Sequence, residues 1–458
     1  MKDLTKGPVG AHVVELSTFI LMTTFFQTLY FLADLYFVGR LGKEAVAGVG
    51  LGGTLMLMVV ALTQSLAVGA TSLIAQALGA KDQGRAELLF NQALVLATLT
   101  GLVFGGPAFW LRGAYCRSLA ADAATAELGA RYLDFFVPAL FLQFPLVAMG
   151  AAVRGLGDVR VPTVLSVATV LVNIALAPLL MFGWITPRPL GVAGTAIASL
   201  VAVSLGVAAF AAYFRRPASP LRFRSELLRP RPGLWWAMLR IGVPAGAEFA
   251  LISVYMVLVY GITRDVGSAA QAGFGIGARV MQSLFLPVMA VAFATAPVVG
   301  QNFGAREGGR VRETFLAAAK LGSLVMILMT VLCHIAPEAM VRFFNADPAV
   351  VAFGSEYLRI ISWNFLASGL VFVSSSVFQG MGNTLPPLAS SSLRLLLFAV
   401  PAWLVSRTPD FPMRTIWYLS VASVGLQVVL NLWLLRREFG RKLAFEPALL
   451  PEEAAAQA

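Results

Sequence analysis

The chain has 458 residues, of which 58% are hydrophobic and only 12% are charged, and its 34 lysines and arginines against 23 acidic residues give a formal net charge of +11. A soluble domain carries roughly 25% charged residues, and a chain this apolar could not cover its surface in water. The composition therefore excludes an ordinary soluble protein and places the chain in a lipid bilayer. The basic excess is typical of loops that set membrane orientation, so we expect no nucleic-acid partner.

Apolar segments of about 20 residues, the length that crosses a bilayer as a helix, follow one another along the whole chain. They are continuous and rich in Ala, Leu, Val and Gly, unlike the alternating strands of a membrane barrel. We therefore predict an all-α polytopic membrane protein with twelve transmembrane helices, at residues 13–38, 47–75, 88–111, 132–153, 163–183, 191–214, 241–263, 272–300, 314–335, 357–379, 387–405 and 415–435.

The most polar internal stretch lies between the sixth and seventh of these helices. Residues 215–240 hold seven arginines and four prolines. This pattern predicts a basic linker at 215–240, between an N-terminal six-helix lobe at residues 1–214 and a C-terminal six-helix lobe with its tail at 241–458. Basic residues also concentrate in both tails and in the other loops on the linker's side. Because basic loops stay in the cytoplasm, both termini and the linker are predicted to be cytoplasmic.

An internal repeat gives the strongest single signal in the sequence. The stretch Ala45–Arg85 matches Ala270–Arg310 without a gap, at an offset of 225 residues, and the register persists as far as Pro162 and Pro387. An even number of spans returns each repeat to the same side of the membrane, so the two lobes have like topology. Parallel repeats of this kind are a recurrent plan of transporters, whose lobes rock about a central site. A duplicated scaffold or channel is the alternative.

Glycines gather at the starts of the second and eighth helices. We expect them to allow close packing between helices rather than to contact a ligand. They are Gly48, Gly50, Gly52, Gly53, Gly273, Gly275 and Gly277.

Asp34 lies toward the end of the first predicted helix. A carboxylate inside a spanning helix costs about 2.5–3.5 kcal/mol on insertion scales, so it normally faces a polar cavity. At helical spacing its face also carries Gln27, Tyr30, Phe31 and Phe37. A carboxylate, a phenol and aromatic rings together suit a lipophilic cation, through charge attraction and cation–π contact. Asp34 could exchange a proton as its cavity hydrates or hold Na⁺ with neighbouring oxygens, and the composition does not choose between them. Alternatively it caps or pairs at the outer interface.

The second lobe has an acid of its own, Glu248, in the seventh helix after Pro244. Tyr255 lies on the same helical face, and we place both residues in the substrate cavity. The repeat offset pairs Glu248 with Thr23, so the two lobes carry their acids at different depths. The amides of Asn173 and Asn364 face the cavity or bond a neighbouring helix. Arg394, inside the eleventh helix, either pairs with Glu248 or reaches the cytoplasmic interface.

Several motifs together resemble the multidrug and toxic compound extrusion (MATE) family of the MOP flippase superfamily. They are the run Asp34–Gly42, the helix ends Gln76-x-x-Gly79-Ala80 and Gln301-Asn302-x-Gly304, the turn Gln379–Thr384, and Gly242-x-Pro244-x-x-x-Glu248. The resemblance covers essentially the whole chain. It implies a secondary antiporter in the bacterial inner membrane that exports lipophilic, mostly cationic drugs against entry of H⁺ or Na⁺.

The same resemblance suggests roles for three residues. Asp34 matches the first-helix acid of cation coupling and drug release, Asn173 matches its fifth-helix partner, and Glu248 matches the seventh-helix acid of a cation site. Where many members have an acid before the fifth-helix proline, this chain has Ala177, and the region of the tenth-helix acid is neutral. The coupling ion is therefore expected to be H⁺, or Na⁺ held at Asp34 and Asn173.

Two other functions compete with antiport. A lipid or lipid-linked oligosaccharide flippase of the same superfamily would line its cavity with several cations, whereas Arg394 is the single clear mid-helix arginine of the sequence. A membrane-embedded enzyme would need a nucleophile, base or metal cluster, and the two histidines lie near helix ends. We therefore expect no enzyme activity, no cofactor and no certain metal site. The partners we expect are small lipophilic cations and the lipid bilayer, with the protein a monomer.

Overall fold

The structure, a computed structural model of the chain, describes residues 2–217, 219–408 and 412–444. Its elements in these ranges are fourteen α-helices and one short 3₁₀ helix. They are α1 (Val9–Gly39), α2 (Lys43–Gly79), α3 (Gln83–Leu119), α4 (Ala123–Gly155), α5 (Arg160–Met181), α6 (Val192–Arg215), η1 (Ser225–Leu228), α7 (Pro232–Val266), α8 (Ser268–Gly304), α9 (Gly308–Ile335), α10 (Pro337–Arg342), α11 (Pro348–Ile361), α12 (Asn364–Gly380), α13 (Leu385–Ser406) and α14 (Met413–Lys442).

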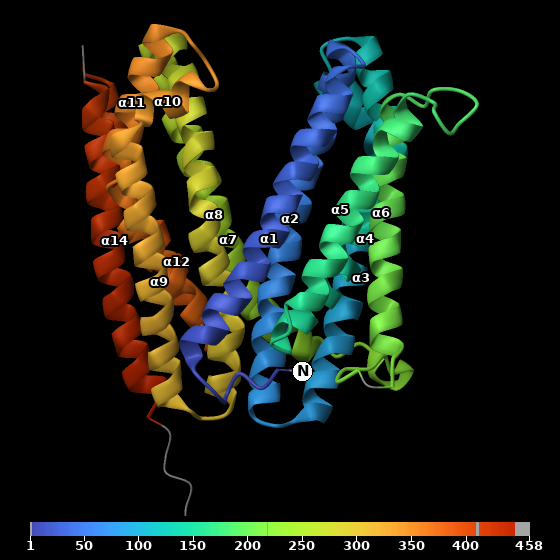
Figure 1. Cartoon of the computed structure of the whole chain (residues 1–458), viewed down its shortest axis with the longest axis vertical. Coiled ribbons are helices and arrows are strands. Elements are labelled where there is room, and N and C mark those ends of the chain that lie inside the picture. Colours follow the sequence, from blue (N-terminus) through green and yellow to red (C-terminus); the bar gives the residue numbers. More distant parts are fainter. Residues whose placement is uncertain (1, 218, 409–411, 445–458) are drawn as a thin grey trace, which may run out of the picture.

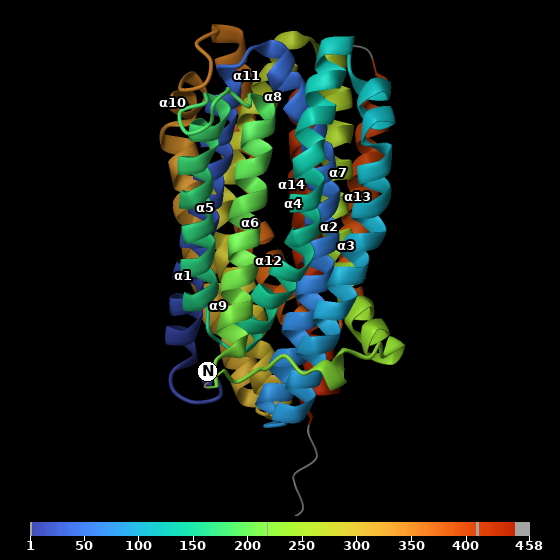
Figure 2. The same cartoon turned by 90° about the vertical axis from the view of Figure 1, so that its right-hand side faces the viewer.

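The helices form two lobes that meet at one end of the molecule and diverge toward the other (Figure 1). Helices α1–α6 make the N-terminal lobe and α7–α14 make the C-terminal lobe. In the view turned by 90°, the long helices still run close to the long axis (Figure 2). The end where the lobes meet also carries the N-terminal segment, the α2–α3 and α8–α9 turns and the linker at residues 216–231. We call this end the basic end.

Twelve membrane crossings account for these helices. Eleven described helices are long and apolar enough to span a bilayer, and α11 with α12 makes one more, bent by 55°. The predicted all-α class and number of spans are confirmed, but the tenth span is not the single helix predicted at 357–379. Helix α11 ends at a tight turn, in which the Phe365 N–H donates to the Ser362 carbonyl over 3.0 Å. No proline or glycine marks this break, so the sequence pattern did not reveal it.

Most helices are longer than the apolar segments predicted. Helices α2, α3 and α8 each have 37 residues, which is about 55 Å of helix. The hydrocarbon core of a bilayer is only about 30 Å thick. The extra turns therefore lie beyond the apolar segments, where hydropathy could not find them. The short helix α10 was also not predicted.

The repeat found in the sequence is visible in the packing of both lobes. A Cβ on Gly52 of α2 would lie 2.6 Å from the ring of Tyr132, and a Cβ on Gly277 of α8 would lie 2.5 Å from the ring of Tyr357. Each glycine and each tyrosine is 225 residues from its counterpart. These glycines let an aromatic ring lie directly against the helix, as predicted for close packing, whereas Gly50 has no neighbour within 4 Å.

At the basic end, the two lobes touch through backbone at helix ends. A Cβ on Gly79 would lie 1.9 Å from the Gln301 carbonyl oxygen, and a Cβ on Gly304 would lie 2.0 Å from the Gln76 carbonyl oxygen. The glutamine side chains also cross over: the Gln76 amide donates to the Gly380 carbonyl over 2.8 Å, and the Gln301 amide donates to the Gly155 carbonyl over 3.0 Å. We call these six residues the lobe seam. Each half of the seam repeats the other at the 225-residue offset.

The linker is held against the outside of α3. The buried side chain of Gln92 donates to the carbonyls of Leu227 and Arg229 and accepts from the Arg231 N–H, over 2.6–2.9 Å. Glu87 forms an ion pair with an arginine of the linker over 3.0 Å. The predicted linker is therefore a docked strap beside the lower part of α3 (Figure 2) rather than a free tether.

Candidate functional site

Asp34 lies on α1, in the half of the helix away from the basic end. Its side chain is part-buried, and its Oδ1 atom is fully buried with no hydrogen-bond partner among the described residues. Thr195 on α6 lies beside it, and the Thr195 hydroxyl is likewise buried without a hydrogen bond in the described chain. A carboxylate oxygen without a donor, inside the bilayer, has unused capacity to bind a proton or a cation.

A chain of hydrogen bonds starts one turn before Asp34. The Tyr30 hydroxyl and the Ser199 hydroxyl lie 3.2 Å apart, and the Asn173 amide donates to Ser199 over 3.0 Å. Helices α1, α5 and α6 are thereby joined at the level of the acid. The structure thus brings Asn173 into the network next to Asp34, through Ser199 rather than by direct contact.

The other residues predicted on this face separate into two groups. Phe37 packs against the core of the N-terminal lobe. Gln27 is exposed, and Phe31 is 65% exposed. Only Tyr30 and Phe37 of the predicted neighbours therefore turn inward with Asp34.

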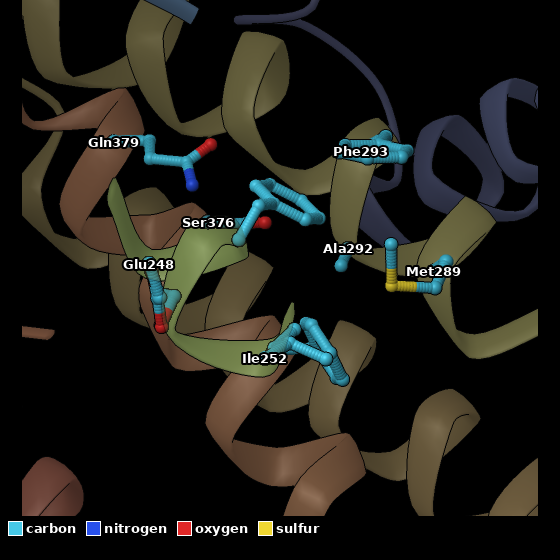
Figure 3. A pocket seen from close by; sticks show the side chains of 10 residues that line it. Glu248, Ile252, Met289, Ala292, Phe293, Ser376 and Gln379 are labelled. Carbon is cyan, nitrogen blue, oxygen red and sulfur yellow. The ribbon is translucent and has the colours of Figure 1, made fainter. Parts of the chain in front are cut away.

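Glu248 lies in a recess of the C-terminal lobe, seen from close by in Figure 3. Its Oε1 atom accepts hydrogen bonds from the hydroxyls of Ser375 on α12 and Ser391 on α13, over 3.0 and 3.1 Å. The Gln427 amide of α14 donates to Ser391 over 3.0 Å. Glu248 therefore differs from Asp34, because one of its oxygens is held by two donors.

Tyr255 lies two turns beyond Glu248 on α7. Its hydroxyl and the Ser420 hydroxyl lie 3.0 Å apart, and the amide of Asn364 donates to Ser420 over 3.4 Å. Asn364 is the first residue of α12, directly after the bend, and its Oδ1 atom is buried with no hydrogen bond to the described chain. The guanidinium of Arg394 lies over the Tyr255 ring, 5.0 Å from its centre. The expected alternatives for Arg394 are both absent, since it lies in the recess and no described acid is within ion-pair distance.

Sequence reasoning found the charged residues but missed their partners. The hydroxyl and amide groups of Thr195, Ser199, Ser375, Ser391, Ser420 and Gln427 lie far from the acids in sequence. A serine in an apolar helix gives no signal of its own, because it often bonds its own helix. No group of three His, Cys, Asp or Glu side chains able to hold a metal occurs in the described part of the chain. The one carboxylate and one hydroxyl at Asp34 and Thr195 are oxygen donors of the kind that hard cations prefer.

Comparison with known proteins decides the family. The MatE family model matches residues 20–179 and 244–404, one segment in each lobe. The chain belongs to the MatE family. It is 25% identical over 421 residues to the probable multidrug resistance protein YoeA of Bacillus subtilis, covering 90% of each chain. It is 24% identical over 410 residues to the probable multidrug resistance protein NorM of Thermotoga maritima, covering 89% of this chain and 88% of that one.

The fold agrees with this membership. A solved structure described as the outward-facing conformation of a multidrug resistance MATE family transporter of the MOP superfamily superposes with a TM-score of 0.88, at 22% identity, covering 97% of this chain and 98% of that one. The predicted MATE resemblance and the two-lobed fold are therefore confirmed. In this MatE protein the bundle around Asp34 and the recess around Glu248 are the two places where acids lie among the spanning helices.

Proposed function

We propose that the protein is a secondary active antiporter that exports lipophilic, mostly cationic drugs or toxic compounds in exchange for H⁺ or Na⁺. The observation that carries this proposal is the Asp34 carboxylate, which keeps an oxygen without a donor among the spanning helices. The names of the relatives, multidrug resistance proteins, support the same function. A lipid flippase is not favoured, because a carboxylate at Asp34 would repel an anionic headgroup.

Coupling follows if one carboxylate serves both ions. A drug cation and a proton, or Na⁺, compete for the Asp34 oxygen, so binding of one releases the other. Tyr30, Ser199 and Asn173 fix the wall of this site through their hydrogen bonds. Asn173 therefore acts as a positioning residue for the coupling site.

Glu248 is proposed as the second acid that contacts cations. Two serine hydroxyls already hold one of its oxygens, so it is less free than Asp34 to exchange its ion. We therefore assign the main coupling step to Asp34 and a substrate contact to Glu248, with Tyr255 and Asn364 beside it. Gln27 and Phe31, both exposed, are proposed to meet the substrate on its way.

The basic end is proposed to face the cytoplasm of a bacterium, with the protein in the inner membrane. Its arginine-rich linker and turns support this orientation. The lobe seam then closes the cytoplasmic side, while the lobes diverge toward the outside (Figure 1). Opening the seam and closing the far end would give the inward-facing state of an alternating-access cycle. We expect a monomer without cofactor or enzyme activity.

Gradient-driven transport in proteoliposomes tests the function. Purified protein is reconstituted and ethidium movement is followed under a pH gradient without Na⁺, and under a Na⁺ gradient at fixed pH. Transport under one of these gradients is expected, and its identity names the coupling ion. Absence of transport under both gradients would contradict the proposal.

Asp34→Asn tests the coupling residue. The amide keeps the size of the side chain but cannot bind a proton or pair with a cation, so coupled export should be lost while protein yield is unchanged. Glu127→Gln is the matched control, because Glu127 is an exposed acid that pairs with Arg131 at the end of the N-terminal lobe away from the basic end. Full gradient-driven export by Asp34→Asn would refute the assignment.

A further inference from the structure

Arg394 is a cation in the middle of α13 without an acid to pair with. Its Nε atom is buried with no hydrogen bond to the described chain, and no described carboxylate lies within 4.0 Å of it. A charged side chain inside a membrane bundle is costly unless it is paired, and such a residue normally faces a cavity that it serves. Arg394 lines the recess that also contains Glu248.

The position of the guanidinium is fixed without using its hydrogen bonds. It lies over the ring of Tyr255, 5.0 Å from the ring centre. Tyr255 is itself held by its hydroxyl contact with Ser420 at 3.0 Å. A cation–π contact orients the guanidinium and leaves its N–H groups available. This arrangement resembles a prepared anion site more than an inert structural contact.

The acid of the recess is close but engaged elsewhere. Ser391, which donates to Glu248, lies on α13 one turn before Arg394, about 4.5 Å along the helix axis. Glu248 and Arg394 therefore line one open recess of about 520 Å³ without forming an ion pair. Between them stand the apolar side chains of Ile252 and Phe372. The recess thus presents a negative group, an apolar wall and a positive group to a single ligand.

We propose that this recess binds amphoteric aromatic substrates, with the substrate carboxylate on Arg394 and its cationic group toward Glu248. A guanidinium matches a carboxylate through two parallel N–H bonds, which an ammonium could not reproduce. The proposal rests on the proposed export function, and it adds that a carboxylate on a cationic compound increases rather than abolishes recognition. Arg394 is then a specificity-determining residue, not part of the ion coupling at Asp34.

A matched pair of dyes tests this recognition. Rhodamine B carries a xanthene cation and a free carboxylate, whereas its ethyl ester carries the same cation without the carboxylate. Binding of each dye to purified protein in nanodiscs is measured by fluorescence anisotropy, which does not depend on transport. For Arg394→Gln we expect affinity for rhodamine B to fall roughly tenfold or more, because a charge-assisted pair is lost. Affinity for the ester should change less than about threefold, and Arg394→Lys should recover part of the loss.

The outcomes separate specificity from a structural role. Equal loss for both dyes, or no loss for rhodamine B, would overturn the proposal. Wild-type protein supplies a test that needs no variant: benzoate should displace rhodamine B but not the ester. Replacing chloride by gluconate distinguishes an inorganic anion, since a chloride site would strengthen rhodamine B binding when emptied by more than it changes ester binding. If wild-type protein binds both dyes but transports neither, the export function fails while the anion site stands.

Discussion

Replacing Gly304 by alanine should force the two lobes apart at the basic end. The new Cβ would lie 2.0 Å from the backbone oxygen of Gln76, whereas ordinary contact begins near 3.4 Å, so α2 and α8 must separate by about 1.4 Å. Backbone cannot rotate away as a flexible side chain can. Overpacking of this kind costs about 1–3 kcal/mol. If the cost falls on the closed seam alone, the balance shifts toward the opened state by roughly 5- to 150-fold.

Distances between spin labels report this shift directly. Gly84 and Gly309 lie in the turns after α2 and α8, are exposed, and have open or ordinary space at their Cβ positions. Cysteines placed there can be labelled selectively, because the native Cys116 and Cys333 are buried. In Gly304→Ala, the distance distribution measured by pulsed electron resonance should gain a longer component than in the unsubstituted protein.

The matched control is Gly440→Ala, since Gly440 lies on α14 near the same end with nothing within 4 Å of its Cβ. It should leave the distances unchanged. The same distribution in Gly304→Ala as in this control, in a protein that still folds, would show that the seam does not limit separation of the lobes. Gly79→Ala offers an independent repeat, because its Cβ would lie 1.9 Å from the Gln301 oxygen.

Two further predictions follow from buried hydrogen bonds. Glu248→Gln should leave thermal stability nearly unchanged because the amide oxygen still accepts from both serine hydroxyls, whereas Glu248→Leu should lower the melting temperature, since each buried hydroxyl left without its acceptor costs about 1–3 kcal/mol; equal melting temperatures for the two variants would contradict this. Gln92→Leu removes three buried hydrogen bonds to the linker, so trypsin should cut the linker arginines faster than in Gln83→Leu, which removes one exposed bond; an unchanged cleavage rate would mean that the linker is held by other contacts.

The sequence was informative where a physical property repeats along the chain. Hydropathy located the twelve crossings, and the 225-residue register predicted two similar lobes, because duplicated segments keep the glycines and tyrosines that their packing needs. It failed at the bend between α11 and α12, where no breaker residue stands. It also failed for the donors around Glu248, because Ser375 and Ser391 reach that acid from more than a hundred residues away. Such contacts depend on tertiary packing, which no local pattern encodes.

Duplication also explains why the two lobes can carry different tasks on one scaffold. Tyr30 and Tyr255 are exactly one repeat apart, and each hydroxyl contacts a serine on the last helix of its own lobe. Beside the first tyrosine stands an acid, Asp34, with an oxygen that no described donor meets. Over the second stands a base, Arg394. The inherited pair keeps a polar anchor at one depth in both lobes, and the charge placed beside it then decides whether that lobe attracts a cation or an anion. Coupling and substrate selection can therefore be altered separately, in different halves of the molecule.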